Sequence, residues 1–119
     1  MTGLSVLRQV YGLMEQPERL SAEDGNETAL AAVNQIYADL WEPRRDGSVF
    51  AVLHHLHETL DLNEHTAMNI MPYGVAMLLA QSDGDTDNQT LYASLYNQRR
   101  PSAVTQSNRI IDRLPRTFM

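Results

Sequence analysis

The sequence predicts an all-α protein, a single domain of about five helices with a buried central helix and an extended C-terminal segment. Three observations favour this class. Apolar residues recur at steps of three and four, and no segment has the strong period of two that marks a half-buried strand. One stretch near the middle is apolar on nearly every side, which is typical of a helix enclosed by its neighbours. The 119 residues, 43% of them apolar, suffice to bury a core without a metal or a crosslink.

The central helix is expected from Pro72 to Gln81, abutting a shorter helix that ends near Met71. Its sequence, PYGVAMLLAQ, has almost no polar face before the final glutamine. Pro72 suits the first turn of a helix, because it has no backbone N–H to leave unpaired there. Gly84 supplies a left-handed stop, and the aspartates that follow can cap the next helix.

Four further segments have apolar residues at helical spacing, and each is expected to pack around the central helix. They span residues 2–14, 26–41, 49–60 and 88–100. Pro43 and Gly47 separate the second segment from the third, and Ser48 can cap the third. The polar segment 16–26 is expected to be a loop.

The last of these helices is expected to have Asp85 or Asp87 as its cap and to end at Pro101. The side chains expected to face the core from it are Leu91, Tyr92, Leu95 and Tyr96. Beyond it the helical spacing is lost. The chain therefore divides into a helical domain, residues 1–106, and an extended C-terminal segment, residues 107–119.

Composition excludes several functions. The chain has no cysteine, so disulfides and thiolate chemistry are ruled out. Its net charge is −6 and all nine cations are arginine, which makes it a poor general binder of a phosphate backbone. The longest apolar stretch is too short to span a bilayer, and the start, MTGLSVLRQVYG, lacks the basic leader and apolar run of a signal peptide.

The segment HHLHE, residues 54–58, could bind a metal. On a helix, His54 would share a face with His57 and with Glu58. There is no HExxH motif and no repeated Glu-x-x-His pair, so a histidine-rich surface helix is the plainer interpretation and no metal ligands are assigned. A helical metal-binding protein remains an alternative. The acidic turn after the central helix does not match the calcium loop of an EF-hand.

No motif in the sequence specifies a catalytic centre or a cofactor. There is no G-x-S-x-G elbow, no phosphate-binding loop and no dinucleotide fingerprint. We therefore expect a non-catalytic protein with no cofactor. A small DNA-associated regulatory domain is a second alternative, because the turn containing Arg44 and Arg45 joins two expected helices. The helix after that turn, however, is acidic where a base-reading helix needs arginine, asparagine or glutamine.

Several short motifs resemble those of small structural proteins from tailed phages and prophages. The sequence MPYGVA, residues 71–76, resembles the (L/M)PYG(L/V)A core of these proteins, and a Gly-Asp turn and a helix ending in aromatic, amide and basic residues follow it at 84–100. The segment AVNQIYADLW, residues 32–41, resembles their INxIYxDL helix. The segment IIDRLPR, residues 110–116, resembles their I-x-D-x-(L/Y)-P tail.

The resemblance implies a head–tail connector, or head-completion adaptor, that is mainly helical and has no enzymatic activity. Its implied partners are the portal protein and neighbouring connector or tail-completion proteins. Such proteins assemble as homo-oligomeric rings at the head–tail junction of the virion, are made in the bacterial cytoplasm, and can be monomers in isolation. DNA passes through the ring without specific binding, and no membrane is involved.

A ring subunit needs a surface that fits a different surface on its neighbour. The extended C-terminal segment is our candidate for this contact. Its apolar side chains would anchor it, and its arginines would pair with acidic groups. The candidate interface residues are Arg109, Ile110, Ile111, Arg113, Leu114 and Arg116. The same segment could instead close the core of its own subunit.

Overall fold

The computed structural model describes residues 1–21, 26–42 and 49–107. Five α-helices and one 3₁₀ helix lie within these ranges, with no strand beyond an isolated bridge between Thr2 and Thr59. The elements are α1 (Gly3–Leu13), η1 (Pro17–Ser21), α2 (Asn26–Leu40), α3 (Glu64–Asn69), α4 (Met71–Ser82) and α5 (Thr86–Ser107). The predicted all-α class is confirmed, although part of the expected loop at 16–26 forms the helical turn η1.

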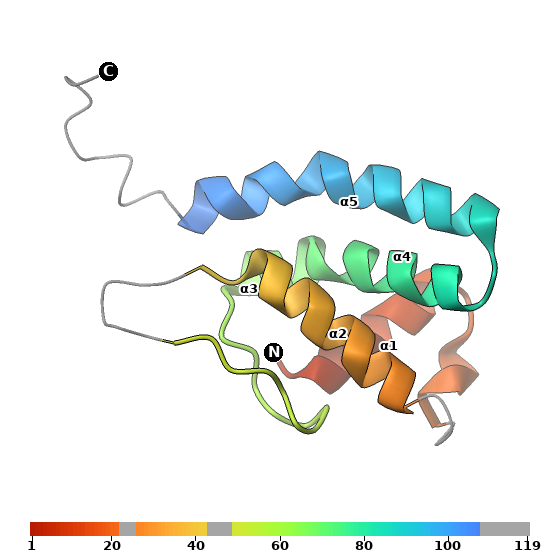
Figure 1. Cartoon of the computed structure of the whole chain (residues 1–119), viewed down its shortest axis with the longest axis horizontal. Helices are drawn as coiled ribbons and strands as arrows, with labels where there is room; N and C mark the ends of the chain where they lie inside the picture. The colour runs from red at the N-terminus through yellow and green to blue at the C-terminus, as the bar shows by residue number, and fades with distance from the viewer. Residues whose placement is uncertain (22–25, 43–48, 108–119) are drawn as a thin grey trace.

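Helix α4 is the central element, as predicted. Figure 1 shows α5 lying along one side of α4 and α1 and α2 lying along the other. Val75, Ala76 and Ala80 are fully buried, because helices cover α4 on several sides. A helix enclosed in this way can be apolar nearly all round without exposing a hydrophobic surface.

The ends of α4 follow from the local sequence. Pro72 lies in its first turn. At the other end Gly84 has a φ of +75°, a conformation that glycine adopts without steric cost. The Asp85 N–H donates to the Ala80 carbonyl over 2.9 Å and the Gly84 N–H to the Gln81 carbonyl over 3.1 Å. These two bonds form a Schellman motif, which pairs carbonyls that the helix leaves free.

Helix α5 is longer than predicted. It begins at Thr86 and continues through Pro101 to Ser107, so the prediction that Pro101 ends it is wrong. Pro101 is on the exposed side of the helix, where water can take the place of the missing amide donor. Leu91 was expected to face the core but is 52% exposed. Tyr92 and Tyr96 are buried as expected, and Leu95 is partly buried against the core.

The predicted helix over residues 49–60 is absent. These residues belong to an irregular segment, 49–63, that we call the covering loop. Its apolar residues have helical spacing but do not share one environment. Leu53 and Leu60 are buried, whereas Val49 is 84% exposed. The spacing therefore reflects separate anchor points on the core, which a period-based prediction cannot distinguish from a helical face.

Distant parts of the chain hold the covering loop by its backbone. The Leu53 N–H donates to Asn34 Oδ1 over 2.8 Å, and Asn34 Nδ2 donates to the Leu53 carbonyl over 2.9 Å. The loop carbonyl of Leu56 accepts from the Leu4 N–H at the start of α1 over 2.7 Å. The first N–H groups of a helix have no partner within it, so the loop and α1 satisfy each other.

Aromatic side chains at the C-terminal end of α2, and just after it, contact both ends of the covering loop. The Asp61 N–H donates to the Tyr37 hydroxyl over 2.8 Å, and Trp41 Nε1 donates to Asp61 Oδ2 over 3.0 Å. The Phe50 ring lies between these aromatics, with its centroid 5.0 Å from that of Tyr37 and 5.7 Å from that of Trp41. Specific hydrogen bonds and ring contacts thus hold the covering loop against the helices.

Gly74 lies where three helices meet. A Cβ atom at this position would be 2.8 Å from Tyr96 Cε1 of α5 and 2.9 Å from Ile36 Cδ1 of α2. Real Cβ atoms essentially never make contacts this short. Only glycine therefore allows α2 and α5 to approach α4 together at this point.

We expect Asn34→Ala to lower the free energy of unfolding by ~1–3 kcal/mol, because it leaves the buried backbone N–H and carbonyl of Leu53 without their partners. Urea denaturation followed by circular dichroism measures the change. Asn97→Ala, at an exposed position of α5, is the matched control and should change stability by less than about 0.5 kcal/mol. Equal effects of the two substitutions would contradict the anchoring role of Asn34.

Gly74→Ala should destabilise the protein by ~1–3 kcal/mol, because the added methyl group overlaps the buried side chains of α2 and α5. Gly12→Ala is the matched substitution, since a Cβ at Gly12 has no atom within 4 Å. It should stabilise the protein by ~0.5–1 kcal/mol through the lower backbone entropy of the unfolded chain. Thermal and urea unfolding measure both changes, and effects of the same sign would refute the close approach at Gly74.

Candidate protein-interaction surface

All six interface residues predicted from the sequence lie outside the described residues. They are Arg109, Ile110, Ile111, Arg113, Leu114 and Arg116. The described chain ends at Ser107, the last residue of α5. Figure 1 shows this end of α5 projecting beyond α3 and the start of α4. The candidate surface described below therefore consists of other residues, on α5 and on the helices next to it.

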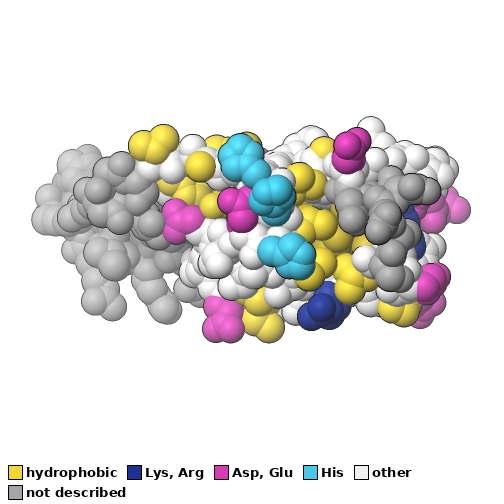
Figure 2. All heavy atoms as spheres, turned by 90° about the horizontal axis from the view of Figure 1, so that it is seen from below, with side chains coloured by type: hydrophobic (Ala, Val, Ile, Leu, Met, Phe, Trp, Pro, Cys, Tyr) yellow, Lys and Arg dark blue, Asp and Glu magenta, His cyan; other side chains and the backbone are white. Residues whose placement is uncertain are grey.

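His54 and His57 do not lie on a helix, so the shared helical face on which the metal-binding alternative depended is absent. His54, His55 and His57 are exposed in the covering loop, and Figure 2 shows histidine side chains gathered on one face of the molecule. The Glu58 carboxylate instead turns back to accept the backbone N–H of His55 over 2.7 Å and that of His54. These backbone bonds lower the pKa of Glu58. Within the described ranges, no group of three His, Asp or Glu residues could hold a metal ion.

The helix-turn-helix considered for the DNA-associated alternative is also not formed, because its second helix is missing. That arrangement required a helix over 49–60 to follow the turn at 42–48, and residues 49–60 form the covering loop instead. Arg44 and Arg45, the two arginines of that turn, lie outside the described residues. A helix-turn-helix reader places its second helix in the major groove. The covering loop supplies no such helix.

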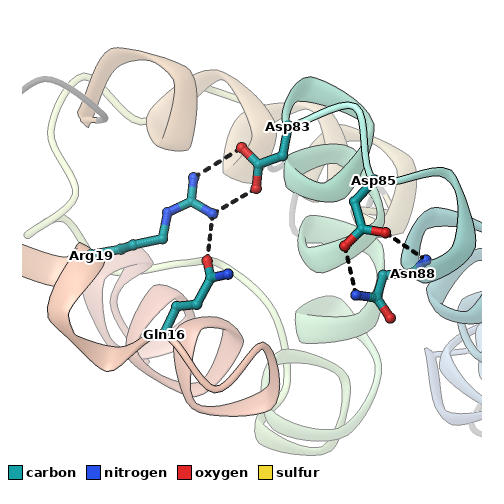
Figure 3. Close-up of polar contacts among 5 residues, drawn as sticks. All are labelled: Gln16, Arg19, Asp83, Asp85 and Asn88. Atoms are coloured by element: carbon teal, nitrogen blue, oxygen red, sulfur yellow. Dashed lines mark hydrogen bonds and ion pairs between the residues drawn. The ribbon is translucent and has the colours of Figure 1, made fainter.

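Carboxylates of the acidic turn after α4 make structural contacts (Figure 3). Asp83 forms an ion pair with Arg19 of η1, with 2.7 Å between Arg19 Nη1 and Asp83 Oδ2. Arg19 also donates to Gln16 Oε1 over 2.9 Å. Asp85 accepts from the Asn88 backbone N–H over 3.2 Å and from the Asn88 side-chain amide over 2.7 Å, so of the two predicted caps, Asp85 and Asp87, it is Asp85 that caps α5.

A polar cluster between α2 and α5 was not predicted from the sequence. The Asp39 carboxylate accepts from the Tyr96 hydroxyl over 2.5 Å and from Arg100 Nε over 2.7 Å. Arg100 Nη2 also donates to the Asp39 backbone carbonyl over 3.1 Å. The hydrogen bonds from Arg100 hold the pKa of Asp39 below its usual value, whereas burial and the bond to Asp39 raise the pKa of Tyr96. The partners of Asp39 come from a helix 57 to 61 residues away, so no local pattern in the sequence points to this cluster.

The described surface carries an open apolar groove between α1 and the α3–α4 junction, which we call the α1/α4 groove. It is lined by Gln9, Gly12, Leu13, Met68, Pro72 and Tyr73. Leu13 and Met68 are both large apolar side chains and are each 39% exposed. Arg99 of α5 lies over the Tyr73 ring, with its Cζ 4.5 Å from the ring centroid. The groove thus combines exposed aliphatic side chains with one aromatic ring held by a cation.

A second groove lies on the other flank of α4 and is called the α2/α4 groove. It is lined by Thr28, Ala31, Ala32, Gln35, Leu78, Gln81 and Ser82. Small and polar side chains dominate it, and none of its residues is among the exposed large apolar ones. The α1/α4 groove is therefore the better candidate for contact with an apolar partner.

The fold and this surface describe a small all-α protein with an open apolar groove. Comparisons with protein-family models, with curated proteins and with solved structures find no match to this chain. Among the described helices, none is both long enough and apolar enough to cross a membrane.

The Asp39–Arg100 contact should stabilise the protein at neutral pH and cease to do so in acid. Because the folded-state pKa of Asp39 lies below the ordinary 3.8, this stability is present above that value and is lost as the pH falls through the lowered pKa. A double-mutant cycle with Asp39→Asn and Arg100→Gln should give a coupling of ~0.5–1 kcal/mol at pH 7 for this partly exposed pair. Urea unfolding at a series of pH values measures it, and a coupling unchanged in acid would contradict the assignment.

Proposed function

We propose that this protein is a non-catalytic structural protein of a tailed-phage or prophage virion, namely a head–tail connector or adaptor. It assembles as a ring with copies of itself and binds the portal protein and neighbouring connector or tail-completion proteins at the head–tail junction. It takes no cofactor.

The proposal is supported by one observation: three motifs that resemble those of the phage proteins contact one another in the core. Gly74 belongs to the segment that resembles the (L/M)PYG(L/V)A core, Ile36 to the INxIYxDL-like helix and Tyr96 to the helix that follows the Gly-Asp turn. A Cβ at Gly74 would be 2.9 Å from Ile36 Cδ1 and 2.8 Å from Tyr96 Cε1. The three motifs therefore join at one packing contact in the core. A shared packing contact supports the resemblance to this family at the level of the fold, and the proposed function follows from that resemblance.

The surface is compatible with assembly into a ring through which DNA passes. Residues 1–107 carry a net charge of −8, and an acidic subunit does not hold the DNA backbone. The exposed apolar side chains of the α1/α4 groove offer a place for another chain to dock. The projecting end of α5 leads into the segment that contains the candidate interface residues.

Measuring the mass of the protein alone and mixed with its portal tests the proposal. We expect a stable complex in which several copies of the chain bind one portal ring, because a connector repeats its contact around the ring. Native mass spectrometry or light scattering after size exclusion gives the stoichiometry. A portal from an unrelated phage is the control and should not bind. If the chain and its own portal elute separately at every concentration, the proposed function is wrong.

A further inference from the structure

We infer that the α1/α4 groove is the docking site for the C-terminal segment, residues 108–119, of a second copy of this chain. Such a contact would join neighbouring subunits of the proposed ring, so it rests on the proposed function and names the two surfaces that meet. It is heterologous, because a groove on one subunit receives a segment from the next. Repetition of a heterologous contact closes into a ring when the rotation between subunits permits.

The chemistry of the segment matches that of the groove. Ile110, Ile111 and Leu114 are three large aliphatic side chains within five residues. The groove offers exposed aliphatic surface at Leu13 and Met68. Packing the aliphatic side chains of the segment against those of the groove removes both from water. Burial of apolar surface is the main driving force for association between proteins.

Charge favours the same pairing. Residues 108–119 contain three arginines and one aspartate, a net charge of +2 within a chain whose total is −6, so residues 1–107 carry −8. A basic segment is attracted to an acidic body, and this attraction speeds encounter and weakens with added salt. A second copy of the chain therefore supplies an apolar groove on a body of opposite net charge, and the cation at the groove edge, Arg99, is engaged with the Tyr73 ring.

The course of α5 favours a neighbouring subunit over the chain's own groove. Helix α5 passes the groove at Arg99, whose guanidinium contacts the Tyr73 ring. The Ser102 hydroxyl makes a later contact with the body, 2.9 Å from His65 Nε2. The helix then continues to Ser107, about 7.5 Å further at 1.5 Å per residue, and projects beyond α3 (Figure 1). Helix α5 therefore ends pointing away from its own groove, so the segment that follows could enter that groove only by reversing direction, whereas it can continue directly onto a neighbouring copy.

One substitution blocks the groove without disturbing the core. Gly12 lines the groove, is exposed, and has space for a side chain, since no atom lies within 4 Å of the point that a Cβ would occupy. Gly12→Arg would place a long cationic side chain in the groove, where it obstructs the segment and repels its arginines. Because arginine forms helices better than glycine, the variant should remain folded. The matched control is Ala31→Arg, at an exposed position of the α2/α4 groove.

A second variant disables the segment and leaves the groove intact. Ile110→Asp combined with Leu114→Asp removes two aliphatic anchors and cancels the positive charge of the segment. Mixing the two kinds of variant then separates contact between copies from contact within one copy. In an equimolar mixture, the groove variant can donate its intact segment to the intact groove of the segment variant, but no further copy can add.

Sedimentation velocity of the full-length proteins from micromolar to near-millimolar concentration tests the inference, with circular dichroism to verify folding. We expect the wild-type protein and Ala31→Arg to gain mass with concentration, and less so in high salt. Gly12→Arg and the double variant should each stay monomeric, with at least a tenfold weaker association constant, and their mixture should form a species of two chains.

A wild-type protein that stays monomeric throughout would overturn the inference, as would association of Gly12→Arg equal to that of the wild type. A mixture of the two variants that remains monomeric would also overturn it, because the segment would then act within its own subunit or on another protein. Portal binding is measured separately. If the protein self-associates as expected but does not bind its portal, the proposed function is wrong and the contact between copies is still supported.

Discussion

The close approach of three helices at Gly74 is the constraint on which the rest of the structure depends. Because this residue has no side chain, Ile36 of α2 and Tyr96 of α5 both reach the backbone of α4. Their approach places the Asp39 carboxylate within hydrogen-bonding distance of Tyr96 and Arg100, which ties the two outer helices together. It also positions α5 so that Arg99 covers the Tyr73 ring at the edge of the α1/α4 groove. One small residue thus links the packing around α4 to the polar contact between α2 and α5.

The carboxylates of this acidic chain help explain how it folds. Asp83 pairs with Arg19 of η1, Asp85 caps α5, and the Glu58 carboxylate closes a turn of the covering loop. Each of these groups satisfies a donor that would otherwise need water, which is the usual role of acidic residues at helix ends and turns. The acidic turn that suggested metal chemistry in the sequence thus makes an ion pair and a helix cap, and Glu58 of the histidine-rich segment binds backbone N–H groups.

Sequence reasoning succeeded where the determinants of structure are local. The ends of α4, the cap at Asp85 and the left-handed Gly84 all follow from residues a few positions apart. It failed for the covering loop, because the partners of Leu53 and Leu56 come from Asn34 and from the start of α1. It failed again at Pro101, whose exposed position lets α5 continue. The α1/α4 groove could not be predicted either, since Leu13 and Met68 come together only in the folded chain.

The join between the first residues and the covering loop affects the order in which the protein can fold on the ribosome. The Leu60 N–H donates to the Met1 carbonyl over 2.8 Å, and Thr2 pairs with Thr59. Helix α1 therefore lacks its N-terminal partners until residue 60 has left the exit tunnel, although α1 is synthesised first. Contacts between positions so far apart slow folding, because a long loop must close before they form. Helices α1 and α2 are also synthesised before α4, the helix against which both pack in the folded protein.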